Sequence, residues 1–155
     1  MKKRIAGLMS LLVVGAMTAP VQAETTTMNY SQTSTYTLSI PSTVTLSATQ
    51  AQSLQIGASA VNTTPTQKVQ VKCTAGIDAS GDATLTRTGG GTAKVRISKT
   101  SGGTGITTST VLAEFQDQST TALSGGGTIY FSAVGNVNAG TYSGTVTFTG
   151  SLTTR

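Results

Sequence analysis

The chain of 155 residues contains no histidine and no tryptophan, and it has a single cysteine, Cys73. Without histidine, a Ser or Cys nucleophile lacks its usual general base, and zinc lacks its commonest nitrogen ligand. One cysteine cannot form a disulfide within the chain, so stability must come from core packing and backbone hydrogen bonds. These absences argue against a triad hydrolase, a zinc protein and a disulfide scaffold.

Charge is also scarce, since Asp, Glu, Lys and Arg make up 10% of the residues and only five are acidic. Asp78 and Asp82 are the one close acidic pair, and with Ser80 they place oxygen atoms at alternate positions, as the start of a calcium loop does. However, Gly81 follows at the fourth position rather than the sixth, and no acidic residue completes the loop. We expect an Asx-type turn here. The protein is predicted to have no metal site, no catalytic residues and no cofactor, and not to be an enzyme.

The N-terminus has the three parts of a secretory leader. Residues 2–4 are basic, residues 5–17 form an apolar run, and Pro20 precedes the small-x-small pattern Val21-Gln22-Ala23. The run is shorter than the ~20 apolar residues of a membrane-spanning helix, so we expect no membrane span in the mature chain. We predict cleavage after Ala23 and a mature protein outside the cytoplasm, at the cell surface, in the medium or in the periplasm.

Removal of this leader changes the charge argument. The formal charge of the whole chain is +5, but three of the ten Lys and Arg residues belong to the leader, which leaves seven against five acidic residues. The remaining basic residues are dispersed, whereas nucleic-acid binding requires basic residues that cluster on one face. The sequence therefore predicts no nucleic-acid partner.

From residue 35 to residue 155, apolar residues recur with period 2, which is typical of strands. Glycine-rich breaks such as Gly89–Gly91 separate the runs and supply the positive φ angles of tight turns. The pattern predicts a single all-β domain, a β-sandwich of seven to nine short antiparallel strands. Val111–Phe115 fits a strand, although Thr110–Gln118 is also the one amphipathic-helix candidate. In the run Val69, Val71, Cys73, the alternation points the thiol inward. The expected strands cover residues 36–40, 44–46, 54–56, 69–73, 84–86, 95–97, 111–115, 129–131 and 142–148.

Residues 24–34 are polar and precede the first clear strand. They fit a flexible arm or an edge strand of the same domain. Alternatively, the alternate residues Thr26, Met28 and Tyr30 form a strand that is donated to the sheet edge of a neighbouring subunit, which is a known recognition mode.

Two stretches carry a resemblance to a known group of proteins. Residues 36–46, YTLSIPSTVTL, resemble the opening strands of small secreted Ig-like surface proteins of Firmicutes, and residues 139–149, AGTYSGTVTFT, resemble the closing strand of those proteins and of WxL-type domains. A similar ending occurs in pilin-like fimbrial subunits. The chain departs from WxL domains in having no tryptophan. The resemblance implies an Ig-like sandwich at the cell surface or in the extracellular matrix.

We therefore expect a structural or adhesive secreted protein, such as a pilin-like fimbrial subunit, that associates with itself or with other surface proteins. The alternative is a monomeric extracellular module that binds carbohydrate or peptide. Such a module needs exposed aromatic side chains, and Tyr30 and Tyr130 are the candidate ligand contacts. No small-molecule substrate is indicated.

Overall fold

The computed structural model describes residues 27–118 and 127–155. The predicted leader, residues 1–23, and Thr26 lie outside the described residues. The chain divides into two units between Ser31 and Gln32, a boundary that falls inside the expected arm. The second unit, Gln32–Arg155, contains all the strands of the described residues.

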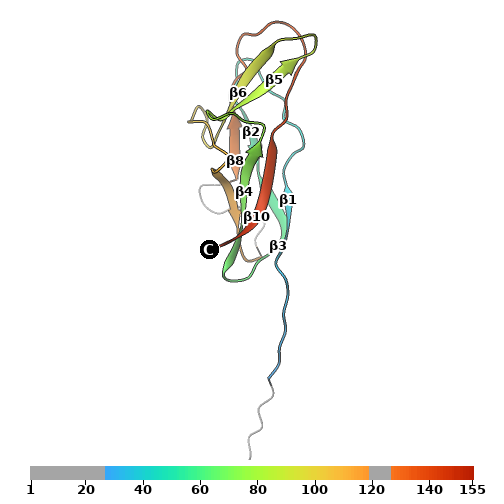
Figure 1. The fold of residues 1–155 in the computed structure, drawn as a ribbon, viewed down its shortest axis with the longest axis vertical. Coiled ribbons are helices and arrows are strands. Elements are labelled where there is room, and N and C mark those ends of the chain that lie inside the picture. Colours follow the sequence, from blue (N-terminus) through green and yellow to red (C-terminus); the bar gives the residue numbers. More distant parts are fainter. Residues whose placement is uncertain (1–26, 119–126) are drawn as a thin grey trace, which may run out of the picture. The chain divides into compact units, whose positions relative to one another are not determined.

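This unit is all-β, as the sequence predicts, and the strands are paired antiparallel in three sheets (Figure 1). No helix occurs in the part of the chain that the structure describes, so no helix there is long and apolar enough to cross a membrane. The strands are β1 (Thr35–Ser39), β2 (Gln52–Gln55), β3 (Gly57–Asn62), β4 (Gln67–Ala75), β5 (Asp82–Arg87), β6 (Thr92–Ser98), β7 (Val111–Phe115), β8 (Thr128–Phe131), β9 (Tyr142–Ser143) and β10 (Thr147–Thr154).

The three sheets differ in size. The largest has the order β2-β8-β6-β5-β9, the second has the order β10-β4-β7, and β1 pairs with β3 alone. The longest pairing joins β10 to β4 and runs from Thr154 opposite Gln67 to Thr147 opposite Ala75. Both β1 and β10 therefore have a strand partner on one edge only.

One apolar cluster forms the core, and its members alternate with exposed residues along the strands. Val69, Val71 and Cys73 are each 0% exposed, which confirms the predicted inward direction of the thiol. Burial raises the pKa of the Cys73 thiol, although a backbone hydrogen bond at Ala75 acts in the opposite direction. The hairpin predicted around Gly89–Gly91 is also present, with all three glycines at positive φ and the Arg87 N–H donating to the Gly91 carbonyl over 2.9 Å.

The strand prediction was wrong in several places, and the described residues form ten strands rather than seven to nine. Strand β3 was missed because its alternation is broken at Ala60, which has a positive φ of 50° next to a register shift in the pairing with β1. Residues 44–46 form no strand, since no neighbouring strand pairs with them. The expected strand 142–148 is split into β9 and β10, which pair with different sheets. The helix candidate Thr110–Gln118 contains strand β7 instead.

Phe115 is the largest fully buried side chain of the core. We expect Phe115→Ala to lower the free energy of unfolding by about 3–5 kcal/mol, because it removes buried apolar area and leaves a cavity. Urea denaturation followed by circular dichroism measures this loss. Thr86→Ala, at an exposed position of β5, is the control and should change stability by less than about 0.5 kcal/mol. Equal effects of the two substitutions would contradict the assignment of the core.

Candidate functional site

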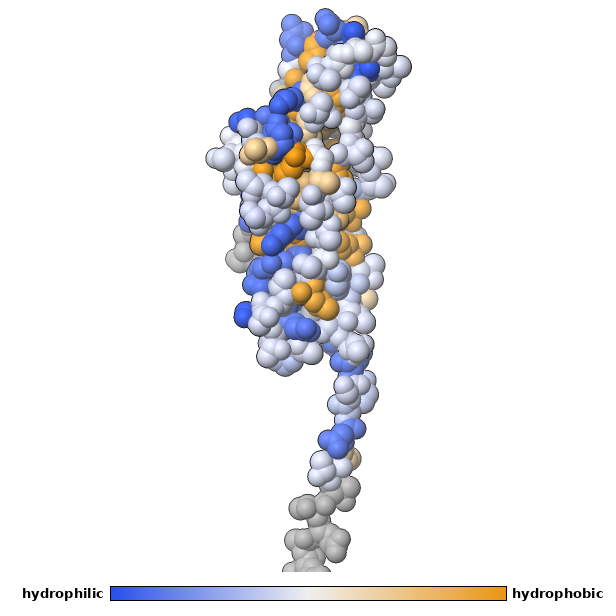
Figure 2. All heavy atoms as spheres, viewed as in Figure 1, coloured by the Kyte–Doolittle hydropathy of each residue, from blue (hydrophilic) through white to orange (hydrophobic). Residues whose placement is uncertain are grey.

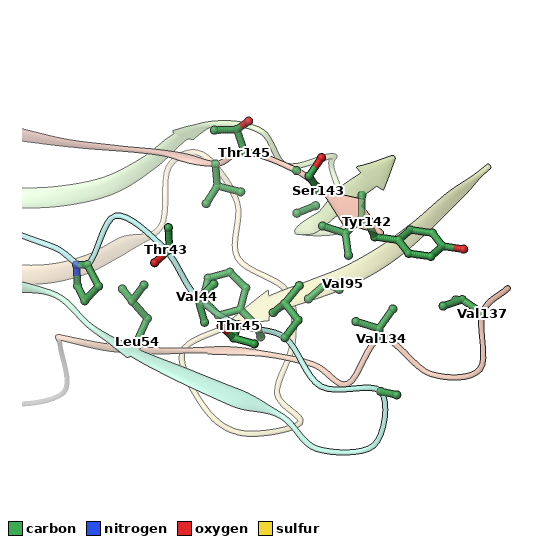
Figure 3. Close-up of a pocket in the computed structure, with 18 of the residues that line it drawn as sticks. Thr43, Val44, Thr45, Leu54, Val95, Val134, Val137, Tyr142, Ser143 and Thr145 are labelled. Carbon is green, nitrogen blue, oxygen red and sulfur yellow. The ribbon is translucent and has the colours of Figure 1, made fainter. Parts of the chain in front are cut away.

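A groove of about 740 Å³ opens beside the core. One wall is formed by residues 41–46 with Ala48, and the other by residues 142–146 with Gly140 and Phe148. Val134, Gly135 and Val137 also line the groove, and its floor is formed by core side chains of β2, β5, β6 and β8. Figure 3 shows Val44, Leu54 and Val95 converging on this space from three different segments. We call it the strand groove.

Half-buried apolar side chains line the strand groove. Val44 and Leu46 come from one wall, and Val146 and Phe148 come from the other; all four pack against the core without being covered. In the space-filling view, hydrophobic residues reach the surface on the side where β1 and β10 lie (Figure 2). A cleft with apolar walls that the domain itself does not cover is typical of a binding surface.

Part of the backbone of each wall is unpaired. Residues 41–46 and 144–146 form no backbone hydrogen bond to any described residue, although each segment continues a strand, β1 and β10 respectively. Unpaired N–H and C=O groups along an extended segment are a template for another strand. The strand groove thus combines apolar walls with two free strand edges.

The edges meet further along β10, at Gly150. The Tyr36 hydroxyl of β1 donates a hydrogen bond of 2.7 Å to the Gly150 carbonyl. A Cβ atom at Gly150 would lie 2.9 Å from the Tyr36 ring and 3.1 Å from the Leu38 side chain, so any other residue would require these side chains to shift. β1 and β10 are therefore joined here by a side chain rather than by a backbone ladder.

Met28 and Tyr30 of the predicted donated strand belong to the first unit. Neither residue is in a strand, and their side chains are 91% and 87% exposed. The third residue of that prediction, Thr26, is outside the described residues. Strand donation by this segment therefore stays a prediction.

Tyr130, the second predicted ligand contact, lies on β8 in a hollow of about 400 Å³. Because successive side chains of a strand point to opposite faces, this hollow is on the other face of the sheet from the strand groove: Val95 of β6 lines the groove, whereas Lys94 and Arg96 line the hollow. No residue that lines this hollow also lines the strand groove. Ligand binding by Tyr30 and by Tyr130 stays a prediction for each residue separately.

The segment around Asp78 and Asp82 forms the expected Asx-type turn. One Asp78 carboxylate oxygen accepts hydrogen bonds from the Ser80 N–H at 2.9 Å and the Asp82 N–H at 3.0 Å, and the other pairs with Lys94 at 2.6 Å. Lys94, followed by the Asp82 N–H, lowers the pKa of Asp78 to about 2, and Asp78 in turn raises the pKa of Lys94. Among the described residues, no three acidic, cysteine or histidine side chains gather as ligands for a metal ion.

Sequence reasoning missed the walls of the strand groove. The alternation of Val44 with Leu46 was visible, but it was interpreted as an ordinary paired strand. Whether an extended segment finds a partner depends on residues distant in the sequence, so the local pattern carries no signal for it. Gly150 gave no signal either, because its role depends on the position of Tyr36 on β1, which is distant in the sequence.

Searches against known protein families, curated proteins and solved structures find no match for this chain.

The hydrogen bond between Tyr36 and Gly150 can be tested by Tyr36→Phe. We expect a loss of about 1 kcal/mol in the free energy of unfolding, because the bond is partly buried and the Gly150 carbonyl loses its partner. The control is Tyr142→Phe, which removes an exposed hydroxyl bond of 3.0 Å to the Asn138 carbonyl. Urea denaturation should give a smaller loss of unfolding free energy for Tyr142→Phe than for Tyr36→Phe. A larger loss for Tyr142→Phe would contradict the role of the Tyr36 hydroxyl in joining β1 to β10.

The Asp78 turn makes the stability of the folded protein depend on pH in the acidic range. The pKa of this carboxyl is lower in the folded chain than the value of about 3.9 in an unfolded chain. The turn therefore contributes its full stability above about pH 4 and loses it as the pH falls toward 2. We expect Asp78→Asn to be less stable than the unmodified protein at pH 6 and closer to it at pH 2. Urea midpoints at several pH values measure this, with Asp117→Asn as the control for loss of one carboxylate.

Proposed function

We propose that this protein is a non-enzymatic structural subunit of an extracellular assembly, of the pilin-like or fimbrial kind. In this proposal the domain is an Ig-like β-sandwich that lacks one strand, and a strand from another copy completes it. The observation that carries the proposal is the strand groove, in which two unpaired edges flank half-buried apolar side chains. A location at the cell surface or in the extracellular matrix follows from the secretory leader predicted from the sequence.

The free edges favour a strand as the occupant rather than a small molecule. A strand between residues 41–46 and 144–146 would form backbone hydrogen bonds on both sides, and its alternate side chains would enter the groove. A small molecule would fill the apolar space and leave the backbone groups without partners. The domain thus offers the two things that strand addition uses, a ladder and a row of apolar sites.

The occupant that we propose is the segment 24–34 of a second copy. Met28 and Tyr30 are large, apolar and exposed, and they alternate with polar residues, as a strand with one buried face requires. As an extended strand, residues 24–34 would span about 36 Å, which exceeds the ~27 Å of an eight-residue strand such as β10. Other surface proteins would bind in the same way if they inserted a similar strand into the strand groove.

Charge substitutions in the arm test the proposal. We expect Met28→Asp and Tyr30→Asp to abolish self-association, because each places a charge against the apolar groove. Asn29→Asp is the matched control, since it adds the same charge at the intervening position and should assemble like the unmodified protein. Size-exclusion chromatography with light scattering over a range of concentrations gives the measurement. An unmodified protein that stays monomeric at every concentration would overturn self-assembly.

The groove side is tested in the same way with Val146→Lys and its neighbour Thr147→Lys. Val146 lines the strand groove, whereas Thr147 is exposed and does not line it. Only Val146→Lys should block assembly, and circular dichroism should show that both variants remain folded. Assembly that survives both Val146→Lys and Met28→Asp would place the interface on a different surface. A monomer whose stability falls with Met28→Asp would indicate that each chain fills its own groove.

A further inference from the structure

The hollow around Tyr130 is a second concave surface that the proposed assembly does not use. It lies on the polar face of the five-stranded sheet, between the strands β5, β6 and β8 and the loop at Gly102 and Gly103. No residue that lines it also lines the strand groove. A ligand in this hollow would therefore not compete with a strand in the groove.

Tyr130 provides the hollow with an aromatic surface. Its neighbours across the sheet are two serines, Ser53 of β2 and Ser98 of β6, so no bulky side chain stands directly beside it in the ladder. The side chain is half-buried, and its hydroxyl forms no hydrogen bond to any described residue. An aromatic ring held at a surface with a free hydroxyl offers both a stacking face and a polar contact.

Next to this ring, Arg96 is held in place by Asp82, its partner in the β5–β6 register. The Arg96 Nε lies 2.9 Å from Asp82 Oδ1, and its Nη2 lies 3.3 Å from Oδ2, while the Asp82 side chain is only 15% exposed. This arrangement leaves Arg96 Nη1 without a partner among the described residues. The hollow therefore presents an oriented donor beside a carboxylate that can accept.

The charges of the hollow compensate one another. Arg96 is paired with Asp82, and Lys94 is paired with Asp78 at 2.6 Å. A charged ligand would have to compete with these pairs. A neutral ligand with several hydroxyl groups would use the remaining donors and acceptors without disturbing them.

The wall formed by the loop is backbone without side chains. Gly102 has a positive φ of 68° and would meet nothing with a Cβ atom, whereas a Cβ atom at Gly103 would lie 2.2 Å from the Thr100 hydroxyl. The loop is fixed by a hydrogen bond of 2.9 Å from the Gly103 N–H to the Thr100 carbonyl. The wall thus lets a ligand approach closely while the loop keeps its shape.

From these contacts we propose that the Tyr130 hollow binds a neutral sugar residue of a glycan. The sugar ring would stack on Tyr130, and its hydroxyl groups would bond to the Tyr130 hydroxyl, Arg96 Nη1 and the Asp82 carboxylate. The space of about 400 Å³ falls within the range of small-ligand sites and suits one or two sugar units. The protein would then carry a glycan contact on a surface that stays open when copies assemble.

Saturation-transfer-difference NMR tests this proposal, because it detects the ligand and works on monomers and assemblies alike. The probes are the neutral disaccharides cellobiose, maltose and lactose, with glucuronic acid as the acidic comparison. We expect transfer to at least one neutral disaccharide and a clearly weaker signal from glucuronic acid. Absence of transfer to all three neutral probes at millimolar concentration, or stronger transfer to glucuronic acid, would overturn the proposal.

Variants locate the site. Tyr130→Ala should weaken binding about tenfold or more, which corresponds to about 1.4 kcal/mol, and Tyr130→Phe should weaken it less because the ring is kept. Thr86→Ala, on the same face of β5 but outside the hollow, is the matched control and should bind like the unmodified protein. Binding that survives Tyr130→Ala in a folded protein would exclude the hollow. Self-association of Tyr130→Ala, measured by light scattering, should be unchanged, so this result is independent of the assembly proposal.

Discussion

The unpaired backbone on both sides of the strand groove is the constraint on which the rest of this structure depends. Buried strands must have hydrogen-bonded neighbours, and here β4, β6 and β8 have them on both edges. In contrast, β1 and β10 are each paired on one side only, which leaves backbone groups on their other edges without a strand partner. The two strands are linked by the hydrogen bond from the Tyr36 hydroxyl to the Gly150 carbonyl. The core is consequently complete in its interior and incomplete along one seam, where Val44, Leu46, Val146 and Phe148 stay half-covered.

The two faces of the five-stranded sheet differ in chemistry because the strands alternate strictly. In β6, Ala93, Val95 and Ile97 are buried while Lys94 and Arg96 face outward, where they pair with Asp78 and Asp82. The ion pairs make the outer face polar without giving it a net charge. The inner face supplies the apolar floor of the strand groove. One short strand thus contributes to both surfaces for which we propose partners, a polypeptide strand on one side and a hydroxylated ligand on the other.

Much of this fold could be predicted from the sequence, because its main signal is local. The alternation in residues 69–73 places Cys73 inside, and the glycine triplet at Gly89–Gly91 marks a hairpin; both features need only neighbouring residues. Strand β3 could not be predicted in this way, since the bulge at Ala60 interrupts its period. The strand groove and the hollow around Tyr130 could not be predicted from the sequence either. Each depends on register between distant segments, such as Ser98 opposite Tyr130, or on the absence of a partner for residues 41–46.

The complete burial of Cys73 determines how this chain responds to an oxidising environment. In the folded domain the sulfur is shielded and its pKa is raised, so little thiolate forms and exchange with external disulfides is slow. In an unfolded chain the same thiol is open to attack. A disulfide between the Cys73 residues of two chains would therefore form while the chains are still unfolded. The fraction of such pairs on a non-reducing gel would report folding speed relative to oxidation rather than any property of the finished protein.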